Sequence, residues 1–288
     1  MKTLITGAGG QVGRMLLETC PDTVEIVACA HADLDIGEVT AVSERIRRDR
    51  PDVIINAAAY TAVDRAESEP QAARRINAEG PGYLARAARD IGARLVHLST
   101  DFVFDGRASS PYRPEAPTGP LSVYGLTKRD GERAVLEGWP DRSVIVRTAW
   151  VYSATGASFL RTMLRLMRER GAVRVVADQV GTPTAARPLA RVLWEIAARA
   201  DILGIRHWTD AGVASWYDFA VAIAEEAAAL GLLPATVSVT PIATEEYPTA
   251  ARRPSYSVLD KRSLAVFGFA PVHWRRRLRE VLSEISHG

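Results

Sequence analysis

Lys2-Thr3-Leu4-Ile5-Thr6-Gly7-Ala8-Gly9-Gly10-Gln11-Val12-Gly13 opens the chain, and this stretch decides its fold. Its first five residues predict a short buried strand, and we expect an apolar helix over 15–19. Strand, glycine turn and helix in this order are the context in which such a motif binds a dinucleotide, with the pyrophosphate at the helix N-terminus. We therefore expect an α/β fold with a Rossmann-type doubly wound parallel sheet. The residues expected to hold the cofactor here are Gly7, Gly10, Gln11 and Val12.

The end of the second strand, expected over 24–30, should lie beside the adenosine ribose. NAD-specific sites usually place an acidic residue there, whereas this chain has Ala30-His31-Ala32. No carboxylate repels a 2′-phosphate and no arginine follows the strand, so we expect NADPH as cofactor with NADH also accepted. Asp35 and Ile36 come next, at the expected adenine edge, although Asp35 can instead cap a helix over 39–49.

Small and hydroxyl-bearing residues follow the next two buried strands, expected over 53–55 and 94–98. Because ligands bind at the carboxyl edge of an open parallel sheet, these residues should meet at one site. Ala58, Ala59 and Tyr60 follow the third strand, and Thr100 and Asp101 follow the fourth. A fifth strand, over 143–147, leads to Trp150 at the same edge, and His97 is expected to be a packed core residue.

Tyr124 and Lys128 stand four residues apart in a segment expected to be helical, so they share a face. A fixed cation favours the phenolate and lowers the pKa of a tyrosine toward neutral pH. The chain has 36 Lys+Arg but only three lysines, at 2, 128 and 261. A compact ammonium bridges two ribose hydroxyls better than a guanidinium does. The alternative interpretation is a solvated helix face.

The composition is that of an ordinary globular enzyme: 288 residues, 47% hydrophobic, 24% charged, with a net charge of +2. This balance predicts neither nucleic acid nor membrane partners, and the arginines at 275–279 are expected to form a solvated helix face. Two cysteines are too few for a disulfide framework or a zinc site, which fits a reducing cytoplasm. The apolar strand at the N-terminus does not resemble a signal peptide.

The regular alternation of strands and helices loosens after residue 150. We expect an NAD(P)-binding Rossmann domain over 1–150, with returning elements near 174–210, and a smaller C-terminal substrate-binding lobe over 151–288. In that lobe the patterns predict helices near 159–170, 187–200 and 216–230 and a strand at 173–176.

Several motifs together give the chain a family resemblance. They are the Gly-x-x-Gly-x-x-Gly loop at 7–13, the run 56–70 (NAAAYTAVDRAESEP), Ser99-Thr100-Asp101-Phe102-Val103-Phe104, Val123 to Lys128, Arg147 to Tyr152, Asp178 to Thr184 and Arg253-Pro254. With these motifs the chain resembles the extended short-chain dehydrogenase/reductases, and most closely their dTDP-4-dehydrorhamnose reductase branch. The resemblance covers residues 4 to about 255.

The resemblance implies roles for individual residues. Thr100 and Tyr124 would hold the 4-keto oxygen of the substrate, and Lys128 the nicotinamide ribose. The sugar would lie against Asp101 and Trp150, and the nucleotide-sugar side would be lined by Val63, Phe102 and Arg253. Some members carry glutamates that bind a divalent ion between subunits, where this chain has Met15 and Arg187. We therefore expect no metal, and a monomer or weak homodimer.

The activity that the resemblance implies is NADPH-dependent reduction of the 4-keto group of a dTDP-4-keto-6-deoxyhexose, first of all dTDP-4-dehydro-L-rhamnose to dTDP-L-rhamnose. One alternative is a 4-ketoreductase for a deoxysugar of a secondary metabolite. Another is a non-catalytic NADP-binding regulatory subunit, although such a subunit has no need to keep Thr100, Tyr124 and Lys128 together. A dehydratase of the same superfamily would place a second acid after Asp101, where this chain has Phe102.

Overall fold

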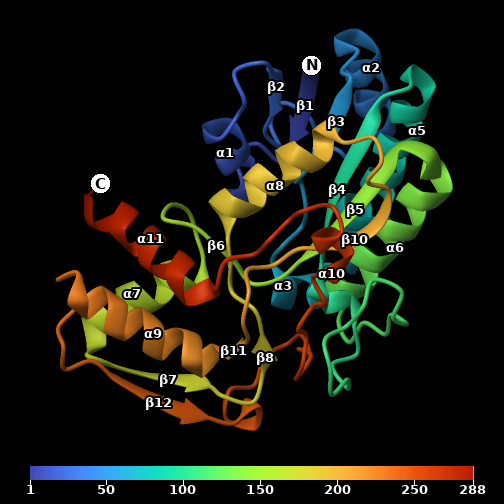
Figure 1. Ribbon diagram of the computed structural model, residues 1–288. Helices are drawn as coiled ribbons and strands as arrows, with labels where there is room; N and C mark the ends of the chain where they lie inside the picture. Colours follow the sequence, from blue (N-terminus) through green and yellow to red (C-terminus); the bar gives the residue numbers. More distant parts are fainter. Residues whose placement is uncertain (288) are drawn as a thin grey trace.

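The computed structural model describes residues 1–287 and is built around a six-stranded parallel sheet in the order β10-β5-β4-β3-β1-β2 (Figure 1). All five pairings in it are parallel, from Lys2↔Glu25 between β1 and β2 to His207↔Arg147 between β10 and β5. The strands are β1 Lys2–Thr6, β2 Glu25–Cys29, β3 Val53–Asn56, β4 Arg94–Thr100, β5 Ser143–Thr148 and β10 Gly204–His207.

Helices cover both faces of this sheet because its central strands are apolar on both sides. One face packs on α1 (Gln11–Glu18) and α8 (Ala186–Ala198), and the other on α2 (Val39–Asp49), α5 (Gly80–Ile91) and α6 (Val123–Gly138). Alternate residues of a strand face opposite cores: Val96 belongs to the first cluster and Leu95 to the second. This arrangement is the doubly wound fold expected from the sequence.

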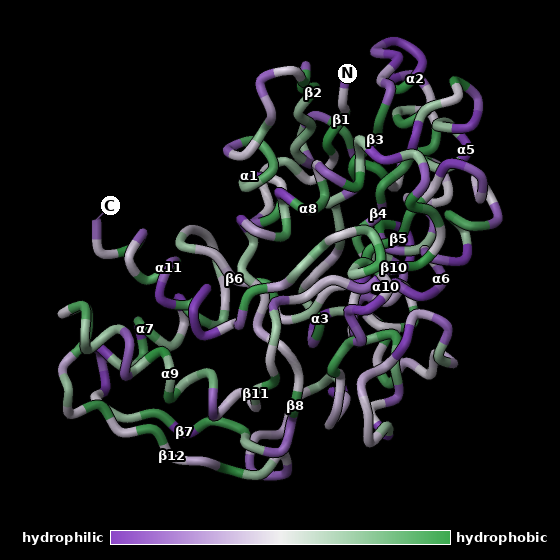
Figure 2. Tube along the Cα trace, in the orientation of Figure 1, coloured by the Kyte–Doolittle hydropathy of each residue, from purple (hydrophilic) through white to green (hydrophobic). Residues whose placement is uncertain are grey.

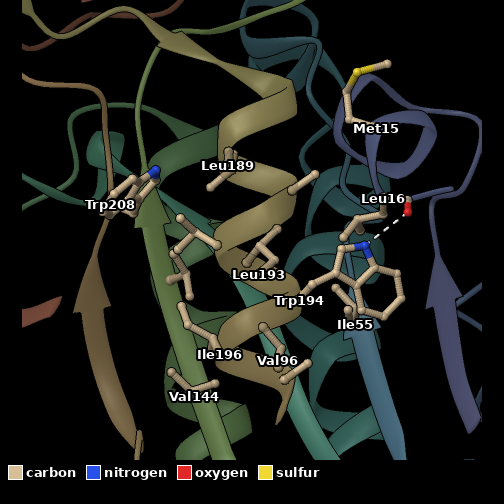
Figure 3. Packing of buried hydrophobic residues seen from close by; sticks show 14 of the residues in the cluster. Met15, Leu16, Ile55, Val96, Val144, Leu189, Leu193, Trp194, Ile196 and Trp208 are labelled. Carbon is tan, nitrogen blue, oxygen red and sulfur yellow. Dashed lines mark hydrogen bonds between the residues drawn. The ribbon is translucent and has the colours of Figure 1, made fainter. Parts of the chain in front are cut away.

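Helix α8 lies directly over the sheet (Figure 3). Its Leu189, Leu193 and Ile196 pack against β4 and β5, and Trp194 reaches sideways to α1, where its indole nitrogen donates to the Leu16 carbonyl at 3.1 Å. This contact satisfies the one polar atom of a large buried side chain. It also fixes α1, and with it the glycine turn, against the sheet.

The remaining elements form a smaller lobe below the sheet as drawn in Figure 1. Its core lies between α7 (Phe159–Arg170), α9 (Trp216–Ala229), α11 (Trp274–His287) and the parallel pair β7 (Ala172–Val176) and β12 (Ser238–Ile242). Short strand pairs join the lobe to the edge of the sheet: β6 (Val151–Tyr152) with β9 (Thr184–Ala185), and β8 (Val180–Gly181) with β11 (Ala214–Ser215).

Two elements from the range near 174–210 return to the sheet domain, namely α8 and the edge strand β10. Strand β7 does not, because its buried residues Val173 and Val175 belong to the apolar core of the lobe and it pairs with β12. Figure 2 shows the central strands as mainly hydrophobic, whereas hydrophilic segments lie on the outer helices and loops.

Smaller elements complete the chain. The connection between β3 and α5 contains three short helices: α3 (Val63–Ser68), α4 (Pro70–Arg74) and a π-helix at Arg75–Glu79. Turns of 3-10 helix lie at Asp101–Val103, Pro140–Arg142 and Thr244–Glu246. The short helix α10 spans Arg262–Ala265. The arginines of α11 form the expected solvated face, with Arg276 and Arg279 74% and 60% exposed, and Arg275 and Arg279 also pair with Glu226 of α9. None of the helices in residues 1–287 has the length and apolarity needed to cross a membrane.

Candidate active site

A cavity of about 1000 Å³ opens at the carboxyl edge of the sheet, where the strand ends meet the lobe. It brings together every site residue expected from the sequence except Asp35: Gly7, Gly10, Gln11, Val12, Ile36, Ala58, Ala59, Tyr60, Val63, Thr100, Asp101, Phe102, Tyr124, Lys128, Trp150 and Arg253. These residues are up to 246 positions apart in the chain, from 7 to 253, so only the fold makes them neighbours.

The glycine loop has the shape that a pyrophosphate requires. A Cβ atom on Gly7, which has φ +69°, would lie 2.6 Å from the Ala58 nitrogen, and one on Gly13 would lie 2.2 Å from the Gly7 carbonyl oxygen. No side chain caps the first turn of α1, which begins after Gly10. Its free amides and helix dipole point at the cavity, a combination that binds phosphate. The loop therefore fits a dinucleotide.

Asp35 is the one expected cofactor residue outside the cavity lining. Its carboxylate accepts from the Gly37 amide at 2.9 Å and from Arg75 Nη1 at 2.8 Å. The alternative role, as cap of the helix over 39–49, is wrong because α2 begins after Glu38 and no side chain caps it. Asp35 shapes the turn that places Ile36 in the lining, a short-range effect that its spacing did not distinguish from ligand binding.

Two basic residues near the adenosine end were missed in the sequence. Arg14, exposed on α1, lines the cavity together with His31, which follows β2. No arginine follows the second strand, and Arg14 comes instead from helix α1. The position of Arg14 directly after the glycine motif was the sequence feature that could have identified it as a cavity residue. A guanidinium at this point can bind a 2′-phosphate by donating hydrogen bonds to it.

Helix α6 carries Tyr124 and Lys128 into the cavity. The Ser122 hydroxyl caps it by accepting from the Gly125 amide at 3.2 Å. Gly125 has no room for a side chain, since a Cβ there would lie 2.2 Å from the Phe102 carbonyl oxygen. This close contact presses the first turn of α6 against the segment after β4 and so brings Tyr124 next to Thr100.

Lys128 is buried, with 2% of its surface exposed, and Nζ donates to the Leu98 carbonyl at 2.7 Å. Burial lowers the pKa of Lys128 to about 8, and the charge of Glu132 partly opposes this. One of the three ammonium hydrogens is used by Leu98, so two remain for a ligand. That number matches the two hydroxyls of a ribose.

The expected effect of the cation on Tyr124 is not what the structure shows. Burial raises the pKa of Tyr124 to about 12, and the Thr100 hydroxyl only partly offsets it. The expected lowering of this pKa by Lys128 is therefore not found, because removal from water raises it most and the nearby Asp101 charge raises it further. Tyr124 is held as a neutral phenol, which is a proton donor.

Thr100 and Asp101 lie beside Tyr124 at the end of β4. The Thr100 hydroxyl donates to Asp101 Oδ1 at 3.0 Å. Asp101 Oδ2 is buried and finds no partner among residues 1–287. Burial raises the pKa of Asp101 to about 6, while the nearby Ser257 and Thr100 hydroxyls pull it down. A buried oxygen without a partner in a cavity is suited to accept a hydroxyl of a ligand.

Trp150 lies in an unusual backbone conformation, with φ +48°, and its indole stacks on Trp216 with ring centroids 3.5 Å apart and planes 4° apart. Phe159 packs against Trp216 at 4.6 Å, and all three rings line the cavity. Trp216 and Phe159 were missed because each stands at the start of a helix, α9 or α7, where an aromatic residue indicates packing rather than a site.

Arg253 also lines the cavity, together with Val63 and Phe102. Its guanidinium pairs with Asp64, Nη2 to Oδ2 at 2.7 Å and Nη1 to Oδ1 at 3.1 Å. The ring of Phe102 meets that of Tyr124 edge to face, 5.6 Å between centroids. The side assigned to the nucleotide sugar is therefore continuous with the tyrosine.

Known proteins share this architecture over their whole length. The solved structure of dTDP-4-dehydrorhamnose reductase from Bacillus anthracis in complex with NADP superimposes with a TM-score of 0.92, at 36% identity, covering 98% of this chain and 99% of that one. The dTDP-4-dehydrorhamnose reductase of Burkholderia thailandensis is 44% identical over 299 residues, covering 99% of this chain and all of the relative.

A further relative has a different name. The probable dTDP-4,6-dihydroxy-2-methyloxan-3-one 4-ketoreductase of Streptomyces antibioticus is 44% identical over 289 residues, covering 99% of this chain and 96% of the relative. The family model for the RmlD substrate binding domain matches residues 1–287. With this match across the chain, and relatives above 40% identity, the chain belongs to the dTDP-4-dehydrorhamnose reductase family of extended short-chain dehydrogenase/reductases.

Proposed function

We propose that this protein reduces the 4-keto group of a dTDP-4-keto-6-deoxyhexose with NADPH, and that dTDP-4-dehydro-L-rhamnose is the substrate. The observation that carries the proposal is one cavity that holds the glycine loop, Thr100, Tyr124 and Lys128 together. A glycine loop alone serves many dinucleotide enzymes. A phenol and a hydroxyl beside it form a site for a developing alkoxide.

The residues divide the work by chemistry. NADPH, when bound, supplies the hydride. Tyr124 donates a proton to the carbonyl oxygen as negative charge develops there, and the Thr100 hydroxyl stabilises the same charge. Lys128 holds the nicotinamide ribose with its two free hydrogens. Asp101 orients the sugar by accepting one of its hydroxyls, and Trp150 packs against the ring.

For the cofactor we propose a preference for NADPH with turnover retained on NADH. Arg14 and His31 favour a 2′-phosphate, while neither is buried in a closed pocket. An exposed charge contact of this kind contributes on the order of 1 kcal/mol, or about fivefold in affinity. We expect Arg14→Ala to raise the KM for NADPH by about fivefold and to leave that for NADH unchanged. Equal effects on both cofactors would rule out this role of Arg14.

The direct test of the function is a substrate panel. Purified protein should consume NADPH only when a 4-keto sugar nucleotide is added, and NMR of the product should show a reduced C4 with the configuration of L-rhamnose. Consumption with none of the 4-keto sugars would refute the proposal and favour a non-catalytic NADP-binding subunit. An exchange of stereochemistry without net NADPH consumption would indicate an epimerase.

A second candidate substrate has support of its own. The Streptomyces antibioticus relative is named for a related deoxysugar and is as similar to this chain as the rhamnose reductase reported above. The same panel therefore includes a second dTDP-4-keto deoxysugar. A kcat/KM that is higher for it than for dTDP-4-dehydro-L-rhamnose would assign the protein to deoxysugar synthesis outside rhamnose.

For the assembly we propose a monomer or weak homodimer without a bridging metal, working in the cytoplasm. Arg187 pairs within the chain with Glu18 at 2.8 Å and with Glu284 at 3.1 Å, so its guanidinium already forms ion pairs with both acids. Within residues 1–287 there is no cluster of three or more potential metal ligands. The two cysteines are unpaired, which fits a reducing compartment. Sedimentation velocity with and without a chelator tests the assembly.

A further inference from the structure

The short helix α3, Val63–Ser68, belongs to a motif whose acidic residues have no part in the proposed chemistry. Val63 lines the cavity, and Ala66 is fully buried and anchors the helix. Asp64 bonds to the segment of Ala251 and Arg253, 187 or more residues later in the sequence. Glu67 bonds to Val123, 56 residues later. Each of those segments carries a residue of the cavity. The helix therefore connects two sides of the site.

Asp64 holds the side of the cavity that carries Arg253. Besides the two contacts with the guanidinium, its Oδ1 accepts from the Ala251 amide at 3.0 Å. The bond with Arg253 holds the pKa of Asp64 below its ordinary value. Arg253 Nη1 also donates to the Ala251 carbonyl at 3.0 Å, so both Nη1 hydrogens are used.

These contacts leave one edge of the Arg253 guanidinium free. The Nε hydrogen and the second Nη2 hydrogen have no partner among residues 1–287, and they lie parallel on the edge that Asp64 does not occupy. Two parallel N–H groups are the geometry that binds a phosphate oxygen pair. Asp64 thus orients the group that faces a diphosphate.

Glu67 holds the side that carries the tyrosine. Its Oε1 accepts from the Val123 amide at 2.8 Å, and Val123 is the first residue of α6, directly before Tyr124. Amides in the first turn of a helix have no partner in the helix itself. A carboxylate there both satisfies the amide and interacts favourably with the helix dipole. Glu67 thus fixes the first residue of α6 to α3, in addition to the Ser122 cap.

We propose that Asp64 and Glu67 are positioning residues, Asp64 for the Arg253 contact with the substrate diphosphate and Glu67 for Tyr124. This inference rests on the proposed 4-ketoreductase function. One rigid helix then sets the distance between the nucleotide and the reacting carbonyl. Because the two acids act on different steps, their loss should separate in the kinetics.

Four variants test the proposal. Asp64→Ala should raise the KM for the dTDP-4-keto sugar about tenfold with kcat within about twofold of wild type. Glu67→Ala should lower kcat about tenfold with that KM within about threefold. Glu67→Gln should restore most of kcat, because an amide oxygen also accepts from Val123. Ser68→Ala, on the same helix, is the matched control, since its hydroxyl bonds only to the Arg65 carbonyl.

Two further measurements keep the outcome clear. The dissociation constant for NADPH and the unfolding midpoint should match wild type in all variants, which excludes general misfolding. Hydrogen exchange should accelerate at the Val123 amide only in Glu67→Ala and at the Ala251 amide only in Asp64→Ala. Unchanged exchange at both amides, or equal changes in KM and kcat for both acids, would overturn the proposal. If wild type reduces no 4-keto sugar, the proposed function fails, and exchange alone decides on the positioning.

Discussion

At the residue scale, Tyr124 is the proton donor of the proposed reaction, held neutral because burial raises its pKa to about 12. Tyr124→Phe removes one oxygen and leaves the packing against Phe102 intact. We expect kcat to fall by roughly 10² to 10⁴, about 3 to 5 kcal/mol, with the dissociation constant for NADPH nearly unchanged. Stopped-flow kinetics and fluorescence titration measure the two quantities. A fall of less than tenfold would mean that another group donates the proton.

Lys128 gives a second prediction at this scale. With its pKa lowered to about 8, the ammonium should lose its proton as pH rises through 8, and the affinity for NADPH should fall over the same range. Lys128→Arg stays charged but is bulkier and has a planar head, in a site with 2% of the lysine exposed. We expect this variant to lose most activity although the chain uses arginine almost everywhere else. Near-normal turnover would show that position 128 needs only a positive charge.

Several of these residues could be placed from the sequence alone because their motifs are local. The glycine loop and the Tyr124/Lys128 pair each depend on spacing within one turn and helix. Arg14, Trp216 and Phe159 could not be placed, because their closeness to the cavity depends on how separate elements pack. The pKa of Tyr124 was misjudged for the same reason, since burial is a property of the folded molecule.

At the scale of elements, the stack of Trp150 on Trp216 joins the end of β5 to the start of α9. The left-handed backbone of Trp150 costs about 1–2 kcal/mol and must be held by its surroundings. Gly181 of β8 lies so close that a Cβ there would be 2.6 Å from the indole. Helix α9 is fixed in turn by a capping box of Ser215 and Asp218. The lobe therefore determines how Trp150 faces the cavity.

Trp216→Ala should release Trp150 and raise the KM for the dTDP-4-keto sugar by about tenfold, since stacked rings contribute about 0.5–1.5 kcal/mol. Trp216→Phe keeps an aromatic partner and should recover most of the affinity. Steady-state kinetics with NADPH at saturation measure both variants. An alanine variant with the wild-type KM would show that Trp150 holds its conformation without the stack.

The sequence patterns predicted the boundaries of some helices better than those of others. The helices expected over 39–49 and 159–170 are α2 and α7, since amphipathic periodicity and a clear stop define both. The region between β3 and α5 was harder, because α3, α4 and the π-helix at Arg75–Glu79 are too short to show a period. Their positions depend on side-chain bonds such as Tyr60 to Glu69 at 2.7 Å.

At the scale of the whole molecule, stability should depend on pH through Asp210, which lies on the loop from β10 toward the lobe. It is 1% exposed, Oδ2 accepts from the Ala185 amide at 2.9 Å, and Oδ1 has no partner among residues 1–287. Burial raises the pKa of Asp210 to about 7 from the ordinary 3.8. A raised pKa in the folded state favours folding at low pH, and this contribution is lost as pH rises from about 4 through 7.

Asp210→Asn has no carboxyl proton to lose, so the variant does not lose this stability as pH rises. Its amide oxygen can still accept from the Ala185 amide. The free energy of unfolding of the variant, relative to wild type, should therefore increase between pH 5 and pH 8, by up to about 2.5 kcal/mol. Urea unfolding of both proteins at the two pH values measures the difference, in which the other carboxyl groups cancel. A constant difference across this range would show that Asp210 is not held protonated.

The edge strand β10 has a practical consequence. It comes from residues 204–207, yet it pairs along β5, so the chain must return from the lobe before the sheet is complete. A recombinant fragment that stops near residue 150 would present the bare edge of β5, a strand whose residues are all buried in the whole protein, to other molecules. Such an edge templates aggregation. Fusions, crystallisation fragments and split versions of this protein should therefore keep residues beyond 207 with the N-terminal half.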